Sequence, residues 1–66
     1  MLSLNLSKQT QEMAKMLDEI HVSLKKAAEY SNRNGLYGCE RTLLHMISHI
    51  QTMREQLTET DPGFSL

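Results

Sequence analysis

The feature that most constrains this chain is a heptad-like run of apolar residues in its second half. The apolar positions recur at alternating spacings of four and three residues, as in a coiled coil, and this pattern is typical of a helix that packs lengthwise on another helix. The run consists of Cys39, Leu43, Met46, Ile50, Met53 and Leu57. It predicts helix packing rather than chemistry.

A second run with the same spacing precedes it and predicts another helix, over residues 8–33. The break between the two runs is Asn32-Arg33-Asn34-Gly35, and Asn and Gly tolerate the left-handed backbone that closes a helix. So short a connection favours an antiparallel two-helix hairpin over residues 8–58, with helices at about 8–33 and 37–58. Its predicted seam consists of Met13, Leu17, Ile20, Leu24, Leu43, Met46, Ile50, Met53 and Leu57.

The chain is too small to be expected to fold firmly by itself. Its 66 residues form one small all-α domain at most, and the single cysteine leaves no intrachain disulfide to reinforce the core. We therefore expect the hairpin to be completed by dimerisation or by a helical partner. The cysteine count and the lack of a secretion signal or a long apolar run favour the cytoplasm.

The two ends of the chain fall outside the helical pattern. Residues 1–7 alternate Leu2, Leu4 and Leu6 with polar residues, which fits either a frayed first turn or an arm that docks on another subunit. After Leu57 the pattern stops, and Asp61-Pro62-Gly63 is a breaker. Residues 59–66 are therefore predicted to form a flexible tail.

Candidate catalytic and metal-binding residues are few. His45 and His49 have the i, i+4 spacing of two ligands on one helix, but Cys39 points into the predicted seam and is a poor third ligand. Cys39 also lacks a base close in sequence, and neither Gly35 nor Gly38 belongs to a phosphate-binding loop. The sequence predicts no metal, no cofactor and no enzymatic activity.

The methionines and the apolar residues away from the seam suggest that the hairpin also contacts another protein. Methionine adapts to irregular partner surfaces, and Val22 and Leu44 lie well off the predicted seams. We expect a protein interaction module that binds a helical partner or a second copy. The predicted partner contacts are Met16, Val22, Leu44 and Ile47.

A small regulator that touches nucleic acid is the alternative. Four basic residues gather around the predicted turn and could meet phosphates, namely Lys25, Lys26, Arg33 and Arg41. However, seven Lys and Arg against eight Asp and Glu give the whole chain a formal charge of -1. This balance disfavours nonspecific nucleic-acid binding.

The second predicted helix also carries a resemblance. Together with the hairpin size and a tyrosine in the loop, the segment from Tyr37 to Ile47, Tyr-Gly-Cys-Glu-Arg-Thr-Leu-Leu-His-Met-Ile, resembles the small co-chaperones of type III secretion needle subunits. The resemblance implies a helical hairpin that pairs with a second, helical-repeat chaperone and keeps the needle subunit from polymerising early. Phage and plasmid regulators that dimerise into four-helix bundles share the same outline.

Overall fold

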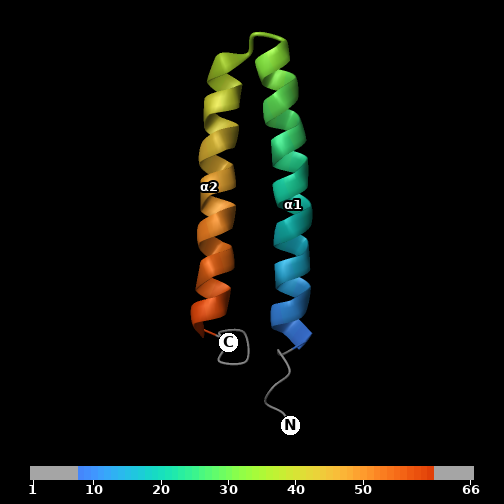
Figure 1. The fold of residues 1–66 in the computed structure, drawn as a ribbon, viewed down its shortest axis with the longest axis vertical. Helices are drawn as coiled ribbons and strands as arrows, with labels where there is room; N and C mark the ends of the chain where they lie inside the picture. The colour runs from blue at the N-terminus through green and yellow to red at the C-terminus, as the bar shows by residue number, and fades with distance from the viewer. Residues whose placement is uncertain (1–7, 61–66) are drawn as a thin grey trace.

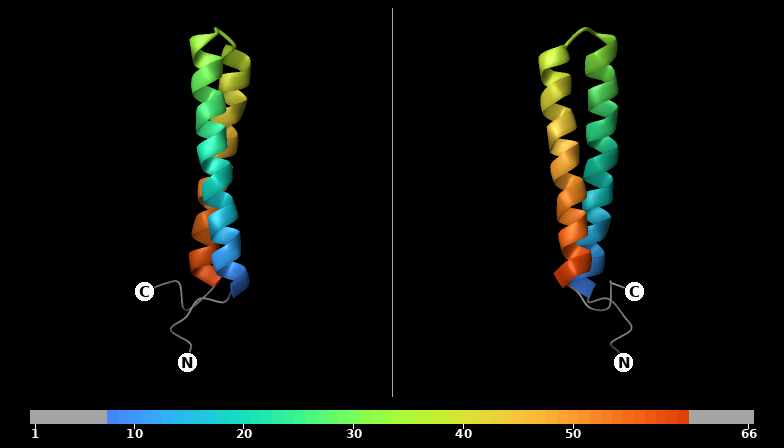
Figure 2. Two further views of the ribbon diagram at one scale, coloured as in Figure 1. Left: turned by 90° about the vertical axis from the view of Figure 1, so that its right-hand side faces the viewer. Right: turned by 60° about the vertical axis from the view of Figure 1, so that its left-hand side comes forward.

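The chain folds into two antiparallel helices joined by a tight turn (Figure 1). The computed structural model describes residues 8–60, and the side chains of residues 8–57. Helix α1 spans Lys8–Arg33 and helix α2 spans Tyr37–Thr60, so α2 ends two residues beyond the predicted boundary at 58. The two helices lie side by side in Figure 1, and the turned views show them crossing each other at a shallow angle (Figure 2). The predicted all-α hairpin is confirmed. The first two residues of the tail predicted over 59–66 belong to α2, and the arm at 1–7 and residues 61–66 lie outside the described residues.

The turn is closed by hydrogen bonds that need a glycine. The backbone N–H of Leu36 donates to the carbonyl of Ser31 at 2.8 Å, and that of Gly35 donates to Asn32 at 3.2 Å. These two bonds form a Schellman motif, in which the residue before the last donor adopts a left-handed backbone. Gly35 fills that position with a φ of 72°. The Asn-Gly pair therefore ends α1 where the sequence predicted.

Helix α2 begins immediately after this cap. The N–H of Glu40 donates to the carbonyl of Leu36 at 3.0 Å, which starts the hydrogen-bond ladder of the helix. The side chain of Asn32 donates to the Glu40 carboxylate at 3.2 Å and ties the end of α1 to the start of α2. The turn therefore sets the direction of α2 and holds its first turn against the end of α1.

The core is a single seam between the helices, which we call the hairpin seam. Within residues 8–57 it contains every side chain that is buried or half-buried, and its members recur at spacings of three and four. Ala14, Leu17, Ala28 and Ile50 are the buried apolar residues. The complete seam is Thr10, Ala14, Leu17, His21, Leu24, Ala28 and Ser31 of α1 with Glu40, Leu43, Ile47, Ile50, Arg54 and Leu57 of α2.

The hairpin seam is rotated relative to the predicted one. Leu17, Leu24, Leu43, Ile50 and Leu57 belong to both. The other predicted members lie beside the seam, 37 to 45% exposed, and they are Met13, Ile20, Met46 and Met53.

The reason for this rotation is the size of the side chains. Each helix carries two apolar stripes that share some of their residues, and on α1 the stripe that faces α2 holds small residues. Ala14, Ala28 and Ser31 are buried there, where they let two backbones approach closely. The bulkier methionine stripe is left on the outside.

Candidate functional site

The methionines next to the hairpin seam lie on one face of the hairpin. Met13 of α1 and Met53 of α2 line a common shallow hollow with Leu17, Gln56 and Leu57, so both point to the same side. Residues seven apart on a helix share a face. The same side therefore also carries Ile20 and Ala27 of α1 and Met46 and Cys39 of α2.

We call this surface the methionine face. It is apolar and hollowed rather than flat at several points. Met13 and Met16 line one hollow, and Met16 lines a second one with Ile20 and Leu24. The side chains that it presents are Met13, Met16, Ile20, Ala27, Cys39, Met46 and Met53, and each of them is exposed.

The middle of the methionine face is free of formal charge. Around its seven residues, the uncharged helix positions on this side are Gln9, Ser23, Thr42, His49 and Gln56. The charges begin at the outer edge of α1, where Glu12 and Glu19 line the hollows beside Met16. Charged residues are depleted from the centres of protein interfaces, where methionine is enriched. An exposed apolar strip without charges is therefore the mark of a contact surface.

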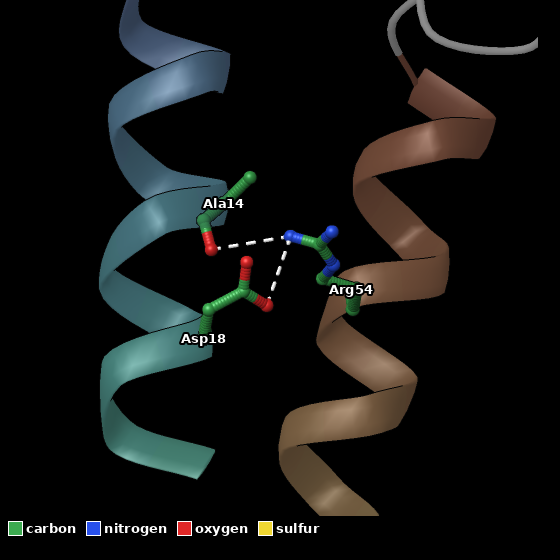
Figure 3. Close-up of polar contacts among 3 residues, drawn as sticks. All are labelled: Ala14, Asp18 and Arg54. Carbon is green, nitrogen blue, oxygen red and sulfur yellow. Dashed lines mark hydrogen bonds and ion pairs between the residues drawn. The ribbon is translucent and has the colours of Figure 1, made fainter. Parts of the chain in front are cut away.

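The opposite face carries the polar contacts between the helices. The Nη1 atom of Arg54 donates to the carbonyl oxygen of Ala14 at 3.1 Å and lies 3.3 Å from Oδ1 of Asp18 (Figure 3). The Asp18 carboxylate is largely exposed, so this ion pair adds little stability by itself. The bond to the carbonyl is directional, and it fixes α2 against α1 near the open end of the hairpin.

A hollow near the turn, on this opposite face, gathers charges of both signs. It is lined by Lys25, Arg33, Glu29 and Glu40, with Leu44 among its apolar residues. Two positive and two negative side chains balance within it. The predicted basic cluster of Lys25, Lys26, Arg33 and Arg41 is therefore interleaved with acidic residues, which weakens its attraction for phosphates.

The four residues predicted to contact a partner do not form one surface. Met16 lies on the methionine face, while Leu44 lines the charged hollow on the opposite face. Val22 is exposed, but nine residues separate it from Met13, which places the two on opposite sides of α1. Ile47 is half-buried in the hairpin seam and is not an outer contact. Of the four, the structure brings only Met16 into the methionine face.

Sequence reasoning missed the rest of the face because it placed those residues in the core. Met13, Ile20, Met46 and Met53 have the spacing of a seam, and spacing alone cannot distinguish a seam from a contact surface beside it. The scarcity of charged residues near the middle of that side was the available signal. A buried seam needs an uncharged strip only as wide as the contact, whereas here the uncharged strip extends well beyond it.

The other candidate sites gain no support from geometry. Within the described residues, no group of three or more His, Cys, Asp or Glu side chains is arranged to hold a metal ion. Cys39 is a free, exposed thiol, and His45 and His49 are exposed on α2. In the same part of the chain, no helix has the length and apolar character needed to cross a membrane.

Comparisons with protein-family models, with curated proteins and with solved structures find no match to this chain.

Proposed function

We propose that this chain is a non-enzymatic protein interaction module, of the co-chaperone, adaptor or inhibitor type, that binds through its methionine face. The observation that carries the proposal is the exposed, uncharged strip of Met13, Met16, Ile20, Met46 and Met53 on one side of both helices. Exposed strips of this kind are costly unless a partner covers them.

The size of the core supports the same conclusion. Four apolar residues are buried in the described part of the hairpin, and one of them, Leu17, is a large side chain that is only 2% exposed. A single core in a chain this small rarely supplies more than about 3–5 kcal/mol. The five large apolar side chains are 37 to 53% exposed. Covering the exposed part would add roughly 0.7–1.5 kcal/mol for each, about half of the value for burying a fully exposed side chain. Association therefore adds stability that the hairpin alone lacks.

Methionine suits such a surface for a physical reason. Its unbranched, polarizable side chain adapts to irregular partner surfaces and fills gaps that a branched residue leaves open. A face built on four methionines can therefore repack around a partner helix. This property is consistent with the co-chaperone type that the second helix resembles.

A matched set of charge substitutions tests the proposal. Met46→Asp places a charge in the middle of the methionine face, and Val22→Asp places the same charge on an exposed position of the opposite side. We expect Met46→Asp to weaken association at least tenfold, because it buries an unpaired carboxylate, and Val22→Asp to have little effect. Circular dichroism checks that both variants stay helical.

Association of either kind is measured: self-association by sedimentation, and binding of another protein by co-purification from cell extract. The proposal requires that whatever associates with the wild-type chain and with Val22→Asp is lost with Met46→Asp. Unchanged association of the helical Met46→Asp variant would refute it. So would an equal loss with Val22→Asp.

A further inference from the structure

We propose that the methionine face is covered by a second copy of the same chain, docked head to tail, so that the two hairpins form an antiparallel four-helix bundle. The inference rests on the proposed function and adds to it the identity and the orientation of the partner. Three properties of the face support it, namely its charge, the distribution of large and small side chains along it, and its area.

The charge distribution allows the face to meet itself. A two-fold contact places the same patch on both sides of the interface, so any charged residue near its centre would face an identical charge. The middle of the methionine face holds no Lys, Arg, Asp or Glu, and the nearest acidic residues, Glu12 and Glu19, lie at its outer edge. The formal charge of the whole chain is only -1, so two copies also repel each other weakly at long range.

Side-chain size changes along the face from one end to the other. The end away from the turn carries Met13, Met16 and Met53. The turn end carries the smaller Ala27 and Cys39, with the large Tyr30 at its edge, and a hollow. The hollow is lined by Ser31, Gly38, Cys39, Thr42 and Leu43. A head-to-head dimer would set methionines against methionines at one end and two hollows against each other at the other end. A head-to-tail dimer sets the methionines of each copy against the hollow of the other, which fills space more evenly.

If the two α1 helices of a head-to-tail pair overlap along their whole length, the positions that face each other follow from helix geometry. Met13 is 20 residues from the end of α1 at Arg33, a distance of about 30 Å, and Ala27 is six residues from it, about 9 Å. The two distances sum to about 39 Å, the length of α1 itself. In a head-to-tail pair, Met13 therefore lies level with Ala27 of the second copy. Ile20 lies midway, so the two-fold axis passes close to Ile20 of both copies.

The area of the face suits a stable dimer. A surface about 39 Å long and two helix diameters, roughly 20 Å, wide has a flat area of roughly 780 Å². Each partner in a stable interface of standard size contributes about 800 Å². A second copy matches this surface in length because it is the same hairpin.

Disulfide trapping tests both the partner and its orientation. In a head-to-tail pair the two Cys39 thiols lie near opposite ends of the bundle, roughly 30 Å apart, far beyond the ~7 Å between Cα atoms that a disulfide permits. In a head-to-head pair they lie at the same level on facing surfaces. A cysteine at position 20 lies close to its counterpart across the two-fold axis. The comparison uses the wild-type chain, Cys39→Ser/Ile20→Cys, and Cys39→Ser/Ser48→Cys, whose exposed thiol lies away from the face and reports random collisions.

We expect the chain to sediment as a dimer. Under mild oxidation, the Ile20→Cys variant should form disulfide-linked dimers at least tenfold faster than the Ser48→Cys variant and at least tenfold faster than the wild-type chain. Rapid linking of wild-type Cys39 would show a head-to-head pair and overturn the proposed orientation. Linking of the Ile20→Cys variant no faster than that of the Ser48→Cys control would overturn the proposed interface.

A fully helical monomer at high concentration would exclude the second copy as partner. If that monomer binds another protein and loses it with Met46→Asp, the proposed function stands and this inference alone fails. If it binds nothing, both fail.

Discussion

Leu17 should be the side chain on which the stability of the hairpin depends most. It is the one large side chain among the described residues that is fully buried, at 2% exposure. Leu17→Ala removes three carbon atoms, and at about 0.8 kcal/mol for each, the lost burial amounts to about 2.4 kcal/mol. The cavity left behind adds to this cost, although a seam between only two helices can partly collapse around it. We therefore expect a loss of about 2.5–3 kcal/mol, in the lower half of the range for buried leucines.

Urea denaturation followed by circular dichroism measures this loss. With a slope of about 1 kcal/mol per molar urea for so small a chain, the midpoint should fall by about 2.5 M. Val22→Ala is the control, because Val22 is exposed on the same helix and alanine favours helix over a β-branched residue. Its midpoint should stay within about 0.5 M of the wild type.

All three proteins are compared at one concentration, because association makes the midpoint concentration-dependent. A shift below about 1 M for Leu17→Ala would refute the assignment of the core to the hairpin seam. A loss of the same size for Val22→Ala would refute it as well, since it would place the core on the other side of α1.

Two further predictions concern the contacts that hold the helices together and the turn between them. Arg54→Met removes both the bond to the Ala14 carbonyl and the contact with Asp18, and should lower stability by about 1 kcal/mol. Asp18→Asn removes only an exposed ion pair and should cost less than about 0.5 kcal/mol, so equal losses in urea denaturation would contradict the importance of the carbonyl bond. Gly35→Ala should cost about 1 kcal/mol because of its φ of 72°. Gly38→Ala should instead stabilise the hairpin by up to about 0.5 kcal/mol, because the new methyl group meets open space and alanine favours a helix. If thermal unfolding showed that Gly35→Ala and Gly38→Ala change the stability in the same direction, this account of the turn would be refuted.

The hairpin itself could be predicted because its signals are local. Spacings of three and four residues indicate helices, and an Asn-Gly pair between two such patterns supplies the left-handed residue that the cap requires. Gly35 occupies that position in the structure, within a motif whose two hydrogen bonds span only a few residues. No knowledge of the distant parts of the chain is needed to place it.

The rotation of each helix could not be predicted in the same way. Leu17 and Leu24 belong to two neighbouring stripes, and the choice between the stripes depends on how closely the backbones approach. Ala14 and Ala28 settle that choice by being small, but alanine carries a weak hydrophobic signal in a sequence. Both stripes have the same spacing, so a prediction from the sequence favours the stripe whose side chains are larger and more hydrophobic.

The candidate site was predicted only in part for a related reason. Met16, Val22 and Leu44 are all exposed, but Met16 lies on the methionine face, whereas Val22 and Leu44 lie on the other side of the hairpin. The rotation of both helices determines which exposed residues of α1 and α2 share a face, so the face cannot be predicted before the rotation is known. The error in the seam therefore carried over into the site.

The contact between Arg54 and Ala14 also bears on the order in which the hairpin assembles. It joins residues that are 40 positions apart in the chain, whereas Asn32 and Glu40 are eight apart. Closing a long loop costs more conformational entropy than closing a short one, so pairing begins at the turn and proceeds toward the ends. We therefore expect the Arg54 contact to form late, after the barrier to folding has been crossed. It would then slow the opening of the finished hairpin, while the contacts at the turn would set the rate of folding.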